Sequence, residues 1–136
     1  MLGVMFSGQA VRYPDIKFIW SHAGGTLPFL AGRLEHMLKH LKERATRLPE
    51  GAIAEMQKFH YDVAAASNKY AMAALMQLVT ADKVLFGTDF PPAGPSLATV
   101  RDLAALGLSA ADMAAIDRDN AVRLMPRLSA APGAAG

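Results

Sequence analysis

Three short apolar runs restrict the possible folds of this chain more than any other feature. Residues 16–21, 59–64 and 83–87 read IKFIWS, FHYDVA and KVLFG, and each run is rich in β-branched or aromatic residues. Runs of this length and composition are typical of buried strands. Because stretches with helical spacing separate them, the pattern predicts an α/β fold with a parallel sheet covered by helices.

The segments around these strands have the apolar spacing of helices. Residues 2–11 are weakly helical. After the first strand, an apolar stripe opposite lysines and arginines comprises Leu34, Met37, Leu41 and Leu48. We expect Ser67 to cap the helix after the second strand, and its apolar face comprises Met72, Leu75, Met76 and Val79. Beyond the third strand we expect three helices. The first spans 96–107, the second begins at Ser109 with Asp112 as its capping-box partner, and the third spans 117–128.

The composition is that of a core-forming chain with room for one domain. The 136 residues are 52% hydrophobic and 19% charged, which excludes a disordered chain. A net charge of +2 without a basic patch argues against a nucleic-acid partner. The absence of cysteine excludes disulfides and thiolate metal ligands. The mean hydropathy of +0.18 is high for so small a chain, so we expect a partner to cover some apolar surface.

The sequence lacks the signals that direct a chain to a membrane. No stretch approaches ~18 uninterrupted apolar residues, and the start, MLGVMFSGQAVRYPD, has neither a basic leading segment nor a cleavage site. We therefore expect a soluble, cytoplasmic protein. We place one domain at residues 1–128 and expect the tail SAAPGAAG, residues 129–136, to be disordered.

Polar side chains occur at or near the carboxyl end of each of the three expected strands. His22 comes directly after the first, Tyr61 and Asp62 lie within the second, and Asp89 follows the third. The carboxyl ends of parallel strands meet at one edge of the sheet, and ligand sites of α/β folds gather there. The agreement of the three strands predicts a functional site at this edge.

His22 and Asp89 are the main candidates for chemistry at that edge. An imidazole at a strand end can act as metal ligand, general acid or general base, and Gly24 and Gly25 permit close backbone approach. The structural alternative is a histidine that bonds a backbone carbonyl. Asp89, in FGTDFPP, suits a metal ligand or a general base. Its alternative is a turn aspartate that bonds local N–H groups.

The remaining polar candidates have simpler explanations. His36 and His40 are spaced as zinc ligands on a helix, but the charged residues around them favour a solvated face. Packing explains His60. Asp62 shares a side of the strand with His60 and is a possible supporting carboxylate. Asn120 falls on an apolar stripe, so we expect a buried amide that bridges to a loop.

Four segments in this order resemble the amidohydrolase superfamily: SHAGGTLPFLAGRL, FHYDVA, KVLFGTDFPP and DNAVRLMPRL. The similar branch contains aminocarboxymuconate-semialdehyde decarboxylase and the aromatic-acid decarboxylases. The resemblance implies the C-terminal part, about strands six to eight, of a (β/α)8 TIM barrel with a divalent metal, usually zinc. It also implies a small carboxylic acid as substrate. Decarboxylation fits the branch, and C–N or lactone hydrolysis is the sibling chemistry.

The resemblance also implies roles for individual residues. His22 matches the acid/base histidine, Asp89 matches a metal-binding aspartate, and Arg33 matches an arginine that binds a substrate carboxylate, in related enzymes across a dimer interface. Phe29 would form an apolar wall beside the site. The structural alternative for Arg33 is an ordinary helix-surface arginine.

The chain departs from the family pattern in its metal ligands. It has neither the His-x-His pair nor the further histidine that the family uses, and a full barrel needs ~250 residues. We therefore expect the chain alone to bind zinc weakly and to be inactive, and expect a homo-oligomer or a complementing N-terminal chain. The alternative hypothesis is a non-catalytic half-barrel that self-associates or binds a partner. A small α/β binding domain unrelated to the barrel is the third.

Overall fold

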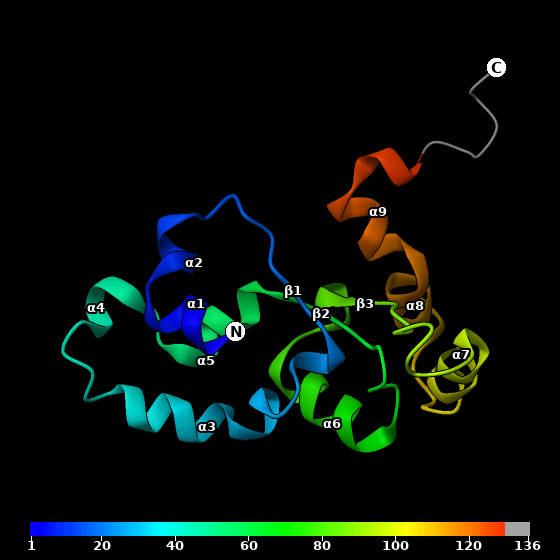
Figure 1. Ribbon diagram of the computed structural model, residues 1–136, viewed down its shortest axis with the longest axis horizontal. Coiled ribbons are helices and arrows are strands. Elements are labelled where there is room, and N and C mark those ends of the chain that lie inside the picture. Colours follow the sequence, from blue (N-terminus) through cyan, green and yellow to red (C-terminus); the bar gives the residue numbers. More distant parts are fainter. Residues whose placement is uncertain (130–136) are drawn as a thin grey trace.

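The computed structural model describes residues 1–129, and most of the tail predicted to be disordered, 130–136, lies outside the described residues. Ser129 itself ends a 3-10 turn. In chain order (Figure 1) the elements are α1 Leu2–Phe6, α2 Gln9–Arg12, β1 Ile19–Trp20, α3 Leu27–Leu38, α4 Arg44–Arg47, α5 Ala52–Lys58, β2 His60–Asp62, α6 Lys69–Leu78, β3 Val84–Leu85, α7 Ser96–Ala104, α8 Ala110–Ala114 and α9 Asn120–Leu124.

The three strands form one parallel sheet in the order β1-β2-β3. Ile19 lies opposite His60, and Tyr61 lies opposite Val84. The strands occur where the apolar runs predict them, but each is shorter than its run. The sheet confirms the predicted α/β fold and its parallel order.

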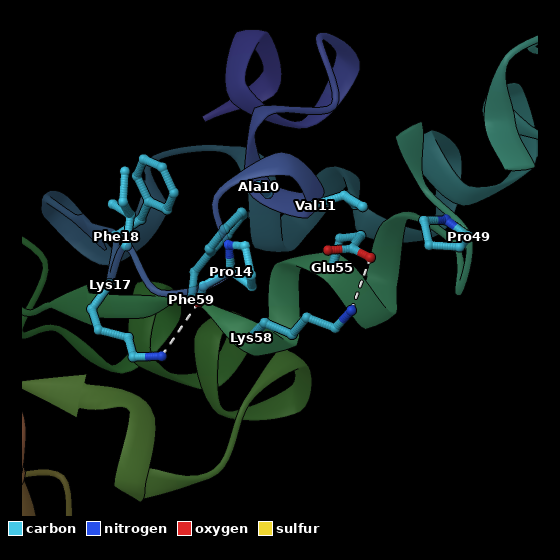
Figure 2. A pocket seen from close by; sticks show the side chains of 10 residues that line it. Ala10, Val11, Pro14, Lys17, Phe18, Pro49, Glu55, Lys58 and Phe59 are labelled. Carbon is cyan, nitrogen blue, oxygen red and sulfur yellow. Dashed lines mark hydrogen bonds and ion pairs between the residues drawn. The ribbon is translucent and has the colours of Figure 1, made fainter. Parts of the chain in front are cut away.

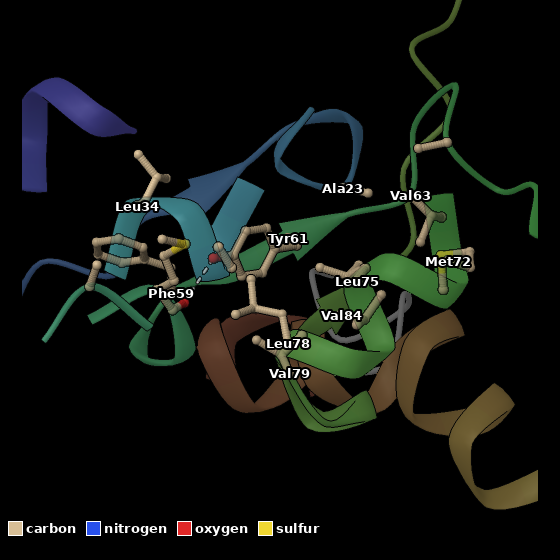
Figure 3. Close-up of a cluster of buried hydrophobic side chains, with 14 of the residues drawn as sticks. Ala23, Leu34, Phe59, Tyr61, Val63, Met72, Leu75, Leu78, Val79 and Val84 are labelled. Carbon is tan, nitrogen blue, oxygen red and sulfur yellow. Dashed lines mark hydrogen bonds between the residues drawn. The ribbon is translucent and has the colours of Figure 1, made fainter. Parts of the chain in front are cut away.

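Helices cover the sheet on the side to which Tyr61 and Val84 point. Both side chains are fully buried, and Figure 3 shows them within a cluster that α6 supplies with Leu75 and Leu78. On the opposite side, Ile19 is 45% exposed. At roughly 25 cal/mol for each Å² of apolar surface removed from water, burial on the covered side is the main stabilising contribution.

A helical turn lies beside the outer edge of β3. A π-helical turn, Ala115–Asp119, packs against β3 and buries Ile116 completely. The amide of Phe86, directly after β3, donates to the Ile116 carbonyl at 2.9 Å. The turn therefore accepts a hydrogen bond that a further strand of the sheet would otherwise accept. Leu85 is buried, whereas its register partner, Asp62, is only partly covered.

The helix after β1, α3, buries a different set of residues from the set that the sequence predicted. α3 ends at Leu38, and a separate turn, α4, begins at Arg44. Leu34 is buried as expected, but Met37 is 57% exposed and the prediction for it was wrong. Leu38 takes the buried position because it lies four residues after Leu34, on the same face of the helix.

The cap of α6 is also one residue from its predicted position. Asn68, not Ser67, is the N-cap, and its side-chain oxygen accepts from the amides of Tyr70 and Ala71, both at 3.1 Å. The two amides lie two and three residues after the cap, as in other asparagine caps. Ser67 is 5% exposed, so its side chain faces the interior.

The helix α5 was not predicted. It begins after Gly51, whose φ of +100° suits glycine, and it buries Ala52, Glu55 and Met56 on one face. Because that face carries a carboxylate, it lacks the continuous apolar stripe that marks a helix in the sequence.

The C-terminal helices confirm two smaller predictions. Ser109 caps α8, accepting from the Asp112 amide at 3.0 Å while its hydroxyl donates to the Asp112 carboxylate at 2.8 Å. The expected last helix is divided between the π-helical turn and α9. Within residues 1–129, no helix is long and apolar enough to cross a bilayer.

Candidate active site

His22 lies in a 3-10 turn, His22–Gly24, directly after β1. The backbone is left-handed at His22 and at Ala23, with φ of +55° at both, and it stays at positive φ through the two glycines that follow. Left-handed non-glycine residues typically cost about 1–3 kcal/mol each and persist only where other contacts hold them. The glycines let the chain reverse into α3 immediately after this strained pair.

The carboxylate of Asp62 supplies those holding contacts. Its Oδ1 accepts from the His22 amide at 2.9 Å and from the Ala64 amide at 3.0 Å. One side chain at the end of β2 therefore fixes the turn after β1 and the turn after its own strand. The sequence suggested Asp62 as a supporting carboxylate, and the support is given to the main chain of His22 rather than to its ring.

The ring of His22 is oriented by a second contact. Its Nδ1 lies 2.8 Å from the carbonyl oxygen of Ala64. Because a carbonyl only accepts, Nδ1 carries the hydrogen, and a neutral ring leaves Nε2 unprotonated. The structural alternative for His22, a bond to a backbone carbonyl, is thus present. The same bond sets the tautomer and leaves Nε2 as the basic atom of an exposed residue.

Two glycines allow the turns to approach closely. A Cβ at Gly24 would lie 2.9 Å from Cε1 of Tyr61, and a Cβ at Gly87 would lie 3.1 Å from both Cβ and Cγ of Asp62. Glycine at 87 therefore leaves space for the carboxylate that holds His22.

Tyr61 supports the site from the covered side of the sheet. Its hydroxyl donates to the Met56 carbonyl at 2.8 Å, and its side chain is fully buried. Burial raises the pKa of the phenol above its ordinary value. Tyr61 is therefore a neutral packing residue and a hydrogen-bond donor within the core.

Asp89 follows β3 at the same edge of the sheet but is not joined to His22 by a contact. Its backbone has a φ of +53°, and its carbonyl accepts from Ala93 at 2.9 Å. Within residues 1–129, its carboxylate makes no hydrogen bond or salt bridge, so the turn-aspartate alternative gains no support from the side chain. The exposed carboxylate remains free to take a ligand.

Arg33 and Phe29 lie on α3, one helical turn apart, and both are exposed. Phe29 is 83% exposed, far above the usual value for an aromatic residue. In the described part of the chain, Arg33 makes no salt bridge. No hydrogen bond or salt bridge joins either residue to His22 in the described part of the chain.

The described residues do not make a complete metal centre. Across 1–129, no three histidine, aspartate or glutamate side chains are grouped closely enough to hold a metal ion. The rings of His36 and His40 stand 6.3 Å apart on an exposed surface, in agreement with a solvated face. Asp89 could provide one ligand, but a structural zinc site needs four and a catalytic one usually three from protein.

A hollow at the opposite end of the sheet contains a charged pair that sequence analysis missed. It measures about 390 Å³ (Figure 2) and includes Glu55, 1% exposed, and Lys58. Lys58 donates to Glu55 at 2.9 Å and lies 2.8 Å from Glu50; these contacts raise the lysine pKa, the Glu50 bond being the largest cause. The spacing of 55 and 58, one helical turn, was the available signal.

The fold and the position of His22 together define the class of protein. A parallel sheet with its polar turns at the carboxyl edge and helices outside is the C-terminal part of a (β/α)8 barrel, whose sites lie at that edge. The amidohydrolase family model matches residues 3–127. The chain belongs to the amidohydrolase family.

Its relatives with established names are decarboxylases. The 6-methylsalicylic acid decarboxylase of Penicillium expansum is 34% identical over 129 residues, which cover 93% of this chain and 40% of the relative. Among solved structures, 2,6-dihydroxybenzoate decarboxylase from Rhizobium superposes with a TM-score of 0.80 at 24% identity, over 95% of this chain and 40% of that one.

A third similar protein was solved with a metal ion. The 5-carboxyvanillate decarboxylase of Novosphingobium aromaticivorans contains manganese and a nitrobenzoic acid; its TM-score is 0.77 at 21% identity, covering 88% of this chain and 36% of that one. The chain thus spans about two fifths of the length of the proteins it matches.

Proposed function

We propose that this chain forms the acid/base part of a decarboxylase that acts on an aromatic or unsaturated carboxylic acid. The observation that carries the proposal is the His22 turn, where one carboxylate fixes the main chain and one carbonyl fixes the ring tautomer. Decarboxylation is favoured over the sibling hydrolysis because the relatives compared here are decarboxylases by name.

His22 would deliver the proton that replaces carbon dioxide. In its protonated form, Nε2 donates to the carbon that bears the carboxylate. The bond to the carboxyl carbon then breaks, its electron pair returns to the organic product, and carbon dioxide leaves. His22 ends neutral with Nδ1 still bonded to Ala64, and water reprotonates Nε2. Because Nδ1 keeps its hydrogen throughout, only Nε2 changes state in each turnover.

Arg33 and Phe29 would act on the substrate from a neighbouring copy of the chain. A guanidinium can hold a carboxylate with two parallel hydrogen bonds, and an exposed phenyl ring can form an apolar wall beside an aromatic substrate. Their exposure on α3 supports a role across an interface, because side chains that face solvent are available to another copy. We therefore propose a homo-oligomer in which α3 of one copy faces the site of another.

Asp89 would contribute one ligand to a divalent metal, for which we propose zinc. The described residues do not complete such a site, so the chain by itself should not retain zinc through gel filtration, and stoichiometric zinc would contradict this proposal. A bound divalent ion supplies a Lewis acid that holds and polarises a substrate oxygen. The remaining ligands would come from the part of the barrel that this chain does not span, in the same or a complementing polypeptide.

A chimera tests the proposed function. Residues 1–129 would replace the matching part of the Penicillium expansum decarboxylase, with carbon dioxide release from 6-methylsalicylic acid as the readout. We expect activity from the chimera and a loss of about a hundredfold or more with His22→Gln, the usual contribution of a general acid. The matched control is His36→Gln, which should keep full activity. A folded, metal-loaded chimera that releases no carbon dioxide would contradict the proposal.

The free edge of β1 favours association as a second candidate function. Among the described residues, β1 pairs with another strand on one side only, and Ile19 is exposed beside its free edge. Open edges readily pair with another chain. Light scattering on the chain would detect a stable assembly, and a strictly monomeric chain would remove this candidate.

A further inference from the structure

A second polar hollow lies at the amino ends of the strands, away from His22. It measures about 300 Å³, close to the lower limit for small-molecule sites. Lys17 enters it from the segment before β1, Lys83 from the residue before β3, and Arg123 from α9. Because three elements supply one cation each, the cluster results from the fold rather than from a run of basic residues.

The cations of this hollow have no carboxylate partner. Across residues 1–129, none of Lys17, Lys83 and Arg123 belongs to a salt bridge. One carboxylate lines the hollow, that of Asp82, and it accepts a hydrogen bond from the Thr80 hydroxyl. Three cations against one carboxylate leave two excess positive charges around a small volume, and such a concentration attracts anions.

Arg123 is held in place by a buried amide. Asn120 is 1% exposed, and its Nδ2 donates to the carbonyls of Ala81 and Val84 at 2.7 and 2.6 Å. Its Oδ1 accepts from the Arg123 guanidinium. The two donor bonds tie α9 to the start of β3 and orient the arginine beside Lys83, so less conformational freedom is lost when a ligand binds.

The ring of His60 forms another wall of the hollow. Its Nδ1 is shielded from solvent and has no hydrogen-bond partner in the described residues. Burial lowers the His60 pKa most, and the charges of Lys83 and Lys17 lower it further, whereas Asp82 raises it. A neutral His60 adds no positive charge, so the excess charge comes from the lysines and the arginine.

We propose that this hollow binds a small dianionic oxyanion of the phosphate type. Two excess charges match a dianion better than a monocarboxylate, and a fixed guanidinium with two flexible ammonium groups can contact several oxygens of one tetrahedral anion. The hollow lies at the end of the sheet opposite to His22, so the anion would occupy a site separate from the proposed chemistry.

Isothermal titration of the 136-residue chain with inorganic phosphate tests this site. We expect saturable binding that is weakened about tenfold by Lys83→Gln and by Arg123→Gln, since each removes a charge-assisted contact. Acetate should bind at least tenfold more weakly than phosphate. Lys39→Gln, which removes the same charge from an exposed residue directly after α3, should bind phosphate like the original chain.

A thermal-unfolding series guards against variants that fold poorly. Phosphate should raise the midpoint of the original chain and of Lys39→Gln, and raise it less in Lys17→Gln. Saturable binding with these differences supports the site. Absence of saturable binding, equal affinity for acetate, or equal weakening by Lys39→Gln would each overturn it. None of these results depends on decarboxylation.

Discussion

The two ends of the three-stranded sheet treat their polar residues differently. At the carboxyl ends, the Asp62 carboxylate accepts a hydrogen bond from the His22 amide, and the His22 ring donates one to the Ala64 carbonyl. At the amino ends, Lys17 and Lys83 have no ion-pair partner within residues 1–129. The Asp62 carboxylate and the His22 ring are therefore satisfied by internal hydrogen bonds, whereas the charges of Lys17 and Lys83 are not balanced by a carboxylate in direct contact.

This difference separates two kinds of site. Internal hydrogen bonds at the carboxyl edge hold a strained turn at His22, keep the ring hydrogen on Nδ1 and leave Nε2 as the atom that can gain or lose a proton. Unpaired cations at the amino edge fix no reacting atom but create a field for a ligand.

Removing the Asn120 amide should cause the largest loss of stability. Asn120→Ala leaves the Ala81 and Val84 carbonyls without their donor at the buried start of β3, so we expect the free energy of unfolding to fall by about 3 kcal/mol. Urea denaturation measures this loss of unfolding free energy. The control is Asn68→Ala, which removes a helix cap and should cost about 1 kcal/mol. Equal losses would show that the two amides support the fold alike.

Asp62→Ala should weaken the other end of the sheet by about 2 kcal/mol, because the amides of His22 and Ala64 lose their charged acceptor. Asp62→Asn keeps a neutral oxygen at this position and should lose about half as much. Urea denaturation of both variants separates the contribution of the hydrogen-bond acceptor from that of its negative charge. An unchanged stability in Asp62→Ala would mean that the His22 turn keeps its conformation without the Asp62 carboxylate.

Gly87→Ala should disturb the same carboxylate by crowding. The new Cβ would meet Cβ and Cγ of Asp62 at 3.1 Å, so we expect a loss of about 1 kcal/mol together with shifted amide resonances of His22. The control is Gly32→Ala on α3, where no atom lies within 4 Å of the added Cβ. There a gain of up to ~1 kcal/mol is expected, since alanine favours helix. Equal effects would refute crowding.

His60 should make the stability of the chain depend on pH. Burial and the nearby Lys83 lower its pKa in the folded state below the ordinary 6.5. The unfolded state therefore binds the proton more readily, and stability falls as the pH drops from 6.5 towards the folded pKa. Urea midpoints across this range should show the fall, and His60→Gln should reduce it. A fall of the same size in His60→Gln would assign the effect to other groups.

Much of the carboxyl edge could be predicted from the sequence. Parallel strands bring their ends together, so His22, Asp62 and Asp89 were placed at one edge from three apolar runs alone. The detailed contacts could not be predicted, because the Asp62 bond to the His22 amide depends on a left-handed turn that no local pattern specifies. The roles of Arg33 and Phe29 remain predictions.

The amino edge was missed for a different physical reason. Lys17 and Lys83 are 66 positions apart and lie in different expected strands, so only the register of β1, β2 and β3 brings them to one hollow. Their common position near the start of an apolar run was the available signal. Asn120, in contrast, was predicted as a buried bridging amide because a polar residue on an apolar stripe needs a partner.

The position of the hydrogen on the His22 ring decides whether Nε2 can act as the proton-transferring atom. Long-range ¹H–¹⁵N correlation spectra of the neutral ring distinguish its two nitrogens. The structure predicts a protonated Nδ1 that donates to Ala64 and an unprotonated Nε2. A neutral His22 ring that carries its hydrogen on Nε2 would contradict the assignment of that atom as the one that moves the proton.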